Sequence, residues 1–263
     1  MDTDVRAYVL DMDGTLYRGN DPLDGGQRLL ECLSGLPYLL MTNCPLHSPI
    51  SLSQKLLKMG MRVEPNKIVT SGQLAITSLK KKGISKIFLI GSTELEQLAE
   101  KAGLVISEDS PQAVLVGYTN PVSSFHLDAA AAHIRKGVAF YCTNMDMTIP
   151  DGPSFIPHTG SLVKLLEEQT GKKAINIGKP SSNFLSYACE QFQCTPDRIC
   201  LIGDNLETDI LMGQQFGCTT YLLLTGVTSQ EDLCKNPAIR PSRIFQDLME
   251  LITYEFPKEN RVE

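Results

Sequence analysis

Short apolar runs recur along the chain, and each ends near Gly, Asn or Asp. Runs of this length with such ends are typical of strands that are buried on both faces of a sheet. The runs are residues 8–10, 38–41, 87–90, 114–116, 138–142, 175–177, 199–202 and 221–224.

Amphipathic stretches lie between these runs, with apolar residues three and four positions apart, as in helices with one buried face. The clearest are residues 51–59, 95–102, 161–169, 183–192 and 210–216. Alternating strands and helices predict an α/β fold in which helices cover a parallel sheet. Ligands of such sheets bind beyond the carboxyl ends of the strands, so the residues that follow each run are the first candidates for chemistry.

Two carboxylates follow the first run, in the sequence Asp11-Met12-Asp13-Gly14-Thr15. Residues at positions i and i+2 of an extended segment point the same way, so Asp11 and Asp13 are expected to project together. Adjacent carboxylates repel each other and favour either a divalent metal or a shared proton. The alternative is a plain acidic turn, since Asp-Gly is a common turn pair.

Polar groups that suit a phosphate follow two further runs. Thr42 and Asn43 offer a hydroxyl and an amide, and Lys179 offers an ammonium. An ammonium acts as a point charge toward phosphate. Taken singly, these residues are equally consistent with a turn and a surface lysine.

A third carboxylate, Asp204, follows residues 199–202 directly, with Asn205 beside it and Asp209 at the start of a predicted helix. Alone, Asp209 is consistent with a helix N-cap. Together, the four strand ends are expected to deliver carboxylates, Lys179, Thr42 and Asn43 to one crevice, which is the equipment of metal-assisted phosphoryl transfer.

The composition excludes several classes of protein. The chain has 263 residues, of which 42% are hydrophobic and 21% charged, an ordinary globular composition. Its net charge of -6 argues against binding to nucleic acid or to an anionic membrane, because both need clustered Lys and Arg. The eight cysteines include no Cys-x-x-Cys pair, so we expect reduced thiols and a cytoplasmic protein. We find no signal-peptide core and no apolar run of membrane-spanning length.

The motifs resemble the four ordered motifs of the haloacid dehalogenase superfamily of phosphatases, most closely its NagD-like branch (class IIA, of the nitrophenyl-phosphatase and nucleotide or sugar phosphatase type). The resemblance runs from about Tyr8 to Leu224. It rests on Asp11-Met12-Asp13-Gly14-Thr15-Leu16-Tyr17, Thr42-Asn43, Gly178-Lys179-Pro180, Gly203-Asp204-Asn205 with Thr208-Asp209-Ile210, and the cap signature Thr143-Asn144-Met145-Asp146 with Pro157-His158-Thr159-Gly160-Ser161-Leu162.

The resemblance implies a Rossmann-like core with an inserted α/β cap of C2 type, and a phosphatase that forms an aspartyl phosphate on Asp11. It implies Asp13 as general acid and base, and Mg²⁺ held by Asp11, the Asp13 carbonyl and Asp204. Thr42, Asn43 and Lys179 are expected to bind the phosphate. Asn205 and Asp209 are expected to lie around the metal site and to position metal-bound water and Lys179.

Spacing supports the cap independently, because residues 44–178 are far more than one crossover helix needs. We place the cap at residues 84–172, between core segments 1–83 and 173–263. Lys80-Lys81-Lys82-Gly83 is expected to be a solvated helix end at that boundary. One continuous larger sheet is the alternative.

The chain departs from the branch pattern at Met145, His158, Ser161 and Cys44-Pro45-Leu46. These changes leave the catalytic positions intact, but they do not identify the substrate. The candidates are a sugar phosphate, a nucleoside monophosphate, pyridoxal phosphate or a similar metabolite. His158 and Cys44 are candidates for substrate contact, and a homodimer through the cap is expected by resemblance. A phosphotransferase or phosphomutase on the same fold and a non-catalytic sensor of phosphorylated ligands are the alternative functions.

Overall fold

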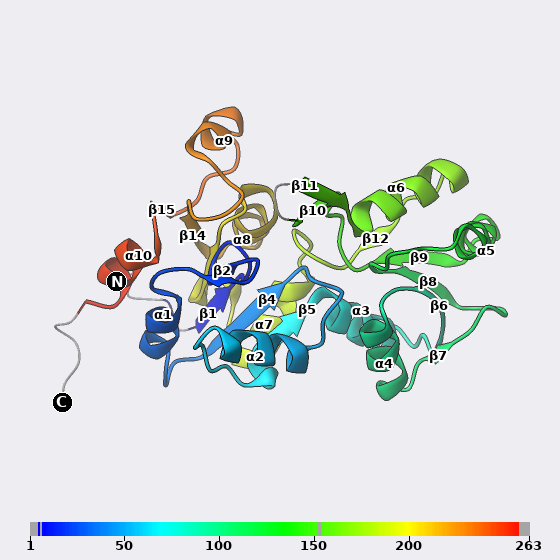
Figure 1. Cartoon of the computed structure of the whole chain (residues 1–263), viewed down its shortest axis with the longest axis horizontal. Coiled ribbons are helices and arrows are strands. Elements are labelled where there is room, and N and C mark those ends of the chain that lie inside the picture. The colour runs from blue at the N-terminus through cyan, green and yellow to red at the C-terminus, as the bar shows by residue number, and fades with distance from the viewer. Residues whose placement is uncertain (1–4, 6, 152–153, 258–263) are drawn as a thin grey trace. The chain divides into compact units, whose positions relative to one another are not determined.

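The computed structural model describes residues 5, 7–151 and 154–257, and the chain divides into two compact units (Figure 1). The first unit comprises Met1–Thr42, Leu52–Val69 and Phe184–Glu263, and the second comprises Asn43–Ser51 and Thr70–Asn183. Each unit is built around its own sheet.

A six-stranded sheet forms the centre of the first unit. Its order is β15 (Arg243–Phe245), β14 (Thr219–Leu223), β13 (Ile199–Gly203), β1 (Ala7–Leu10), β4 (Tyr38–Thr42) and β5 (Ile68–Thr70). The pairings from β4 through β1 and β13 to β15 are parallel, with Ala7 opposite Ile199 and Leu10 opposite Ile202. The carboxyl ends of β1 and β13 therefore meet at one edge.

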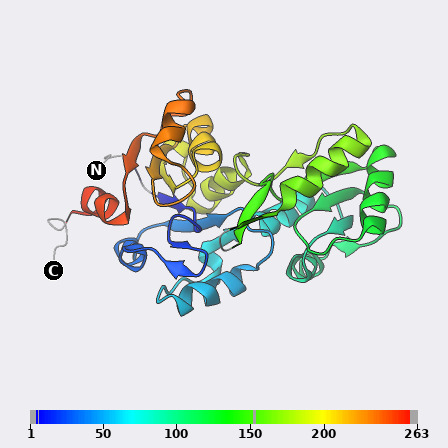
Figure 2. The same ribbon diagram turned by 45° about the horizontal axis from the view of Figure 1, so that its top comes forward.

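Helices cover both faces of this sheet (Figure 2), because its strands alternate the direction of their apolar side chains. Tyr221 and Leu223 belong to a core with α1 (Gly26–Cys32), α2 (Pro49–Lys58) and α10 (Leu248–Glu255). Leu222 packs instead against Leu206 and Ile210. The remaining elements of this part of the chain are β2 (Tyr17–Arg18), β3 (Asp21–Pro22), η1 (Pro65–Lys67), α7 (Asn183–Phe192), η2 (Pro196–Arg198), η3 (Leu206–Ile210), α8 (Leu211–Phe216) and α9 (Gln230–Lys235).

A five-stranded parallel sheet forms the second unit. Its order is β12 (Ile175–Asn176), β9 (Ala139–Cys142), β8 (Ala113–Val116), β6 (Lys86–Ile90) and β7 (Val105–Ile106). Phe88, Val114 and Phe140 face a core made with helices α5 (Ser124–Arg135) and α6 (Thr159–Thr170). The unit also contains α3 (Ser71–Lys81), α4 (Thr93–Lys101) and the antiparallel hairpin of β10 (Thr148–Asp151) and β11 (Ser154–Pro157).

The predicted α/β class is confirmed: all eight apolar runs contain a strand, and the five amphipathic stretches overlap helices. Helix α3 ends at Lys81, with Gly83 in the left-handed region at φ +75°, which confirms the predicted helix end. One continuous sheet is wrong, because β6, β7, β8, β9 and β12 form a sheet of their own. The limits of the cap, residues 84–172, stay a prediction.

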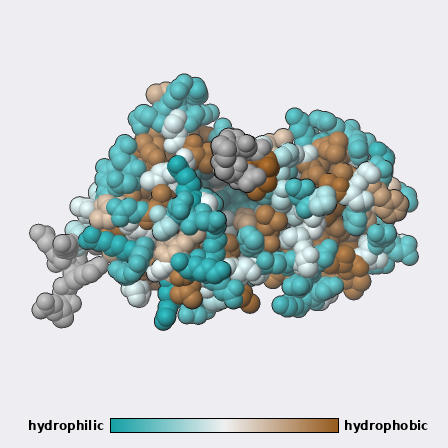
Figure 3. Space-filling view, in the orientation of Figure 1, coloured by the Kyte–Doolittle hydropathy of each residue, from teal (hydrophilic) through white to brown (hydrophobic). Residues whose placement is uncertain are grey.

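The surface mixes polar and apolar residues. On the face drawn in Figure 3, hydrophilic and hydrophobic side chains are interspersed over both units. None of the described helices has the length and apolar character that a membrane crossing requires.

Candidate active site

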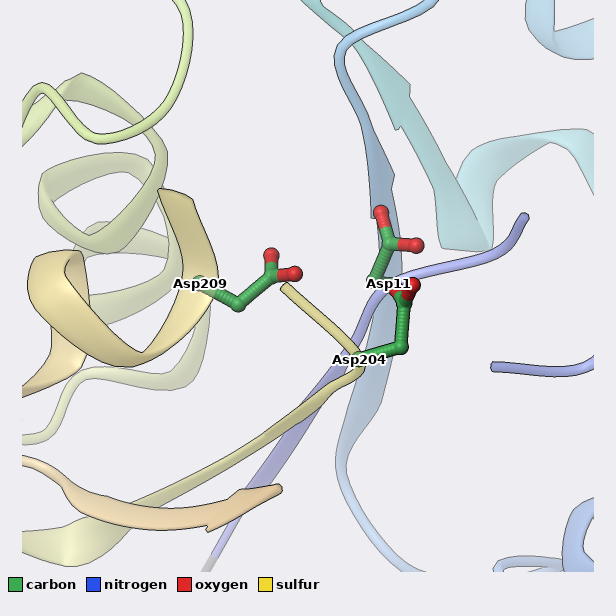
Figure 4. A group of neighbouring side chains, drawn as sticks. All are labelled: Asp11, Asp204 and Asp209. Carbon is green, nitrogen blue, oxygen red and sulfur yellow. The ribbon is translucent and has the colours of Figure 1, made fainter. Parts of the chain in front are cut away.

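Three aspartates of the first unit converge beyond the carboxyl ends of β1 and β13 (Figure 4). Asp11 follows β1, Asp204 follows β13, and Asp209 lies in η3. One carboxylate oxygen from each lies within 4.8 Å of the others. The residues are 8%, 2% and 1% exposed, respectively. Three carboxylates so close and so buried repel one another strongly unless a cation or protons compensate their charge.

Glycines make room for two of these carboxylates. A Cβ atom at Gly14 or at Gly226 would collide with the Asp204 carboxylate, and a Cβ at Gly203 would collide with the Asp209 side chain. Gly14 also has φ +85°, a conformation that other residues rarely adopt. These glycines therefore let the main chain approach the carboxylates closely.

Main-chain amides fix the orientation of the same groups. Val227 N–H donates to Asp204 Oδ2 at 2.7 Å, and Asn205 N–H donates to Asp209 Oδ2 at 3.3 Å. Each bond restricts the rotation of the carboxylate that accepts it. The two carboxylates are thus held in place by the loops that follow β13 and β14.

Asn205 caps η3, and Asp209 does not. The Asn205 side chain accepts hydrogen bonds from Glu207 N–H at 3.0 Å and Thr208 N–H at 3.3 Å. The interpretation of Asp209 as an N-cap is therefore wrong: Asp209 lies in the last turn of η3 and turns its carboxylate toward Asp11 and Asp204. Asn205 acts on the cluster by fixing the turn that carries Asp209.

Asp13 differs from the other aspartates because its side chain is exposed. It lies in a tight turn where Gly14 N–H donates to Tyr17 O at 2.7 Å and Leu16 N–H donates to Met12 O at 2.8 Å. Gly19 N–H reaches Asp13 Oδ1 at 3.3 Å. The cluster of grouped carboxylates does not include Asp13, so its side chain is accessible to solvent and to a ligand.

The loop after β14 was not among the predicted site residues. Thr225 Oγ1 donates to Gly14 O at 2.7 Å, and the Arg18 guanidinium donates to Thr225 O and Gly226 O. Together with the Val227 amide, this loop closes around Asp204. The signal was available, because Thr225-Gly226 follows an apolar run in the same way as the other strand-end motifs do.

A second group of predicted residues lies in the second unit. Asn43 Oδ1 accepts from Lys179 N–H at 2.8 Å, and Asn43 Nδ2 donates to Asp146 Oδ1 at 3.2 Å. Asn144 Nδ2 donates to Asn43 O at 2.8 Å. The Asn43 amide thus holds the main chain of the Lys179 loop, with help from two residues of the predicted cap signature.

Lys179 is 2% exposed, so the alternative of a surface lysine is wrong. That the four strand ends meet at one crevice stays a prediction. The strand before Lys179, β12, pairs with β9 in the five-stranded sheet, whereas β1, β4 and β13 belong to the six-stranded sheet. Thr42, at the end of β4, is 6% exposed.

His158 precedes α6 and is 3% exposed. Its ring stacks on Tyr118, with centroids 4.4 Å apart, and burial lowers the pKa of His158 to about 4. The imidazole is therefore neutral near pH 7. His158 Nδ1 and the neighbouring Thr159 Oγ1 are buried with no hydrogen-bond partner among the described residues. Two such neighbouring atoms are costly to bury unless a ligand or water satisfies them.

Known proteins agree with this arrangement. The family model described as haloacid dehalogenase-like hydrolase matches residues 8–105, and a related model of the same hydrolases matches residues 176–251. The acid sugar phosphatase of Staphylococcus aureus (strain MRSA252) is 31% identical over 94% of this chain and 96% of its own length.

Solved structures are similar over the same span. NagD from E. coli K-12 has a TM-score of 0.88 at 31% identity, covering 94% of this chain and 98% of its own. Glycerol phosphate phosphatase from Mycobacterium tuberculosis, solved in complex with magnesium, has a TM-score of 0.86 at 28% identity, covering 94% of this chain and 76% of its own.

The chain belongs to the haloacid dehalogenase-like hydrolases. Within them it is a NagD-like phosphatase, a hydrolase that acts on phosphoric monoesters.

Proposed function

We propose that the chain hydrolyses phosphate monoesters of small metabolites, sugar phosphates among them, with Asp11 as nucleophile and Mg²⁺ as cofactor. The observation that carries this proposal is the buried cluster of Asp11, Asp204 and Asp209 beyond the ends of two adjacent parallel strands. The similarity to an acid sugar phosphatase supports the choice of substrate class.

The residues fit the cation. Mg²⁺ prefers hard oxygen ligands, and the cluster offers carboxylate oxygens within 4.8 Å of one another, with glycines where the main chain approaches them closely. Asp11, Asp204 and the Asp13 carbonyl are the proposed ligands, and Asp209 lies close enough to share in holding the ion. When bound, Mg²⁺ supplies the positive charge that lets a carboxylate approach an anionic phosphate.

Asp11 and Asp13 divide the chemistry. An Asp11 oxygen bonds to phosphorus while the ester P–O bond breaks, and Asp13 donates a proton to the leaving oxygen. Asp13 then takes a proton from water, which attacks phosphorus and releases Asp11. The exposed side chain of Asp13 suits a group that exchanges protons with substrate and water.

Thr42 and Lys179 are proposed to bind the phosphate oxygens, where a loose transition state spreads its charge. Phosphate binding by Asn43 stays a prediction, and its contacts with Lys179 N–H and Asp146 support a positioning role as well. His158 is proposed to contact the organic part of the substrate, because its Nδ1 and Thr159 Oγ1 are buried without partners among the described residues. A homodimer through the cap and a cytoplasmic location stay predictions.

The experiment is a Mg²⁺-dependent assay of phosphate release from nitrophenyl phosphate and then from a panel of phosphorylated metabolites. Asp11→Asn should abolish turnover while the protein stays folded by circular dichroism, and chelator should abolish turnover of the natural chain. Undiminished activity of Asp11→Asn would refute the proposal. Assays with and without an acceptor sugar separate hydrolysis from phosphoryl transfer.

Asp13→Asn tests the acid role separately. The variant should lose more activity on an alkyl phosphate than on nitrophenyl phosphate, because nitrophenolate leaves without a proton. Equal losses on the two substrates would argue against Asp13 as the acid.

A further inference from the structure

The carboxyl end of α7 brings two cysteines together. Cys194 N–H donates to Cys189 O at 3.2 Å, and Gln193 between them is left-handed, with φ 50°. This six-residue hydrogen bond around a left-handed residue is the Schellman motif that ends many helices. A side-chain contact between the first and last residues often accompanies that motif, and here both residues are cysteine.

The two thiols are accessible as well as adjacent. Both are half-buried and neither is part of a disulfide, and they line an open pocket of about 490 Å³ together with Gln193, Thr195 and Arg198. A small oxidant can therefore reach them. The Arg198 guanidinium lines the same pocket, with its Nε 3.8 Å from the Asp197 carboxylate.

The electrostatics of Cys189 reflect the same proximity. Burial raises the pKa of Cys189, and the negative charge of Cys194 raises it further. The Asp197 carboxylate acts in the same direction, so Cys189 gives up its proton reluctantly and the first attack is assigned to Cys194. A third cysteine nearby, Cys218, is 8% exposed, and burial raises its pKa to about 12, so it is a poor competitor.

We propose that Cys189 and Cys194 form a redox-sensitive dithiol that a hydroperoxide converts to a disulfide. The Cys194 thiolate attacks one peroxide oxygen, the O–O bond breaks, and the released alkoxide or hydroxide takes a proton. The resulting Cys194 sulfenic acid is attacked by the Cys189 sulfur; the S–S bond forms and water leaves with the Cys189 proton. Two thiols are oxidised by two electrons, and the hydroperoxide is reduced by two.

This inference goes beyond the phosphatase activity and does not depend on it. The disulfide would close the turn between α7 and η2, the segment that leads into β13. Cross-linking restricts the unfolded chain, and so the oxidised protein should be the more stable form.

The test is mass spectrometry of the full chain after graded hydrogen peroxide, with iodoacetamide labelling before and after reduction. Tryptic peptide 174–198 holds Cys189 and Cys194 and no other cysteine. After oxidation it should be two hydrogens lighter and take no label, and after reduction it should take two. The exposed Cys234 reports the peroxide dose within the same sample.

Matched variants decide the assignment. Cys189→Ser and Cys194→Ser should each lose the lighter peptide, whereas Cys218→Ser should keep it. Oxidation should raise the Tm of the natural chain by a few degrees and leave that of Cys194→Ser unchanged. Labelling of both thiols at a dose that oxidises Cys234, or a disulfide from either cysteine to Cys218, would overturn the proposal.

Discussion

Asp209 brings a third carboxylate to the cluster from a turn that Asn205 caps. Asp209→Asn keeps the shape of the side chain and removes its charge. We expect the Mg²⁺ concentration for half-maximal activity to rise about 10- to 100-fold, as is usual when a group that supports a metal is altered. Titration of activity against Mg²⁺ measures this half-maximal concentration. Glu207→Gln is the matched control, since Glu207 is exposed on the same turn, and a similar rise in both variants would count against a role for Asp209.

His158 makes the stability of the protein depend on pH. Its pKa in the fold, about 4, lies below the usual 6.5, so the unfolded chain binds the proton first as the pH falls. This contribution is complete above pH 6.5 and is lost as the pH falls toward 4. Between pH 7.5 and pH 5 the natural chain should lose up to about 2 kcal/mol more than His158→Phe, which keeps a ring against Tyr118.

Urea unfolding of both proteins at the two pH values measures this difference. Other groups titrate over the same range, but they do so in both proteins and cancel in the comparison. Parallel losses would show that His158 is charged in the fold at pH 5.

The position of a single residue could be predicted from the sequence where it depends only on neighbouring residues in the chain. The sequence placed Asp11, Thr42 and Asp204 correctly at strand ends, because a buried strand and the polar residue after it are neighbours in the chain. The burial of Lys179 depends on contacts with residues such as Asn43, far away in sequence. No local pattern distinguishes such a lysine from an exposed one.

Among the elements, strand identity was predictable and strand partnership was not. The run that forms β12 has the same apolar pattern as β13, yet the two belong to different sheets. Pairing is decided by long-range packing, which a single run does not encode. The hairpin of β10 and β11 escaped prediction because its strands, Thr148–Asp151 and Ser154–Pro157, each contain a proline and lack a continuous apolar run.

Helix α10 is fastened to the six-stranded sheet by one buried carboxylate. Glu255, 2% exposed, accepts from Tyr8 Oη at 2.7 Å and from Tyr221 Oη at 2.8 Å. Glu255→Ala leaves two buried hydroxyls without this acceptor, so the free energy of unfolding should fall by about 2–4 kcal/mol. Thr253→Ala, at an exposed position of the same helix, should change it by less than about 0.5 kcal/mol.

Chemical denaturation of both variants measures these values. Helix propensity cannot cause the expected loss of stability, because alanine is a better helix former than either residue it replaces. A small loss for Glu255→Ala would mean that water replaces the carboxylate.

At the scale of the whole molecule, a net charge of -6 is compatible with an anionic substrate because the acidic groups are not spread evenly. Three of them are gathered in one cluster of the first unit, where a cation can offset them. The second unit supplies Lys179, which follows β12, and His158, which precedes α6. The first unit thus carries the proposed metal site together with Thr42, and the second unit carries Lys179 and His158, two further residues proposed to bind the substrate.

This division predicts the calorimetric response to Mg²⁺. An ion that binds only the folded first unit should stabilise it by about 2.7 kcal/mol at 100 times its Kd, while the second unit gains nothing. Scanning calorimetry should therefore show one transition that moves upward with Mg²⁺ and one that does not.

Two variants serve as controls. Glu255→Ala identifies the transition of the first unit, because it should lower the same transition that Mg²⁺ raises. Asp204→Asn should remove the Mg²⁺ shift. A Mg²⁺ shift confined to the other transition, or preserved in Asp204→Asn, would place the ion outside the carboxylate cluster.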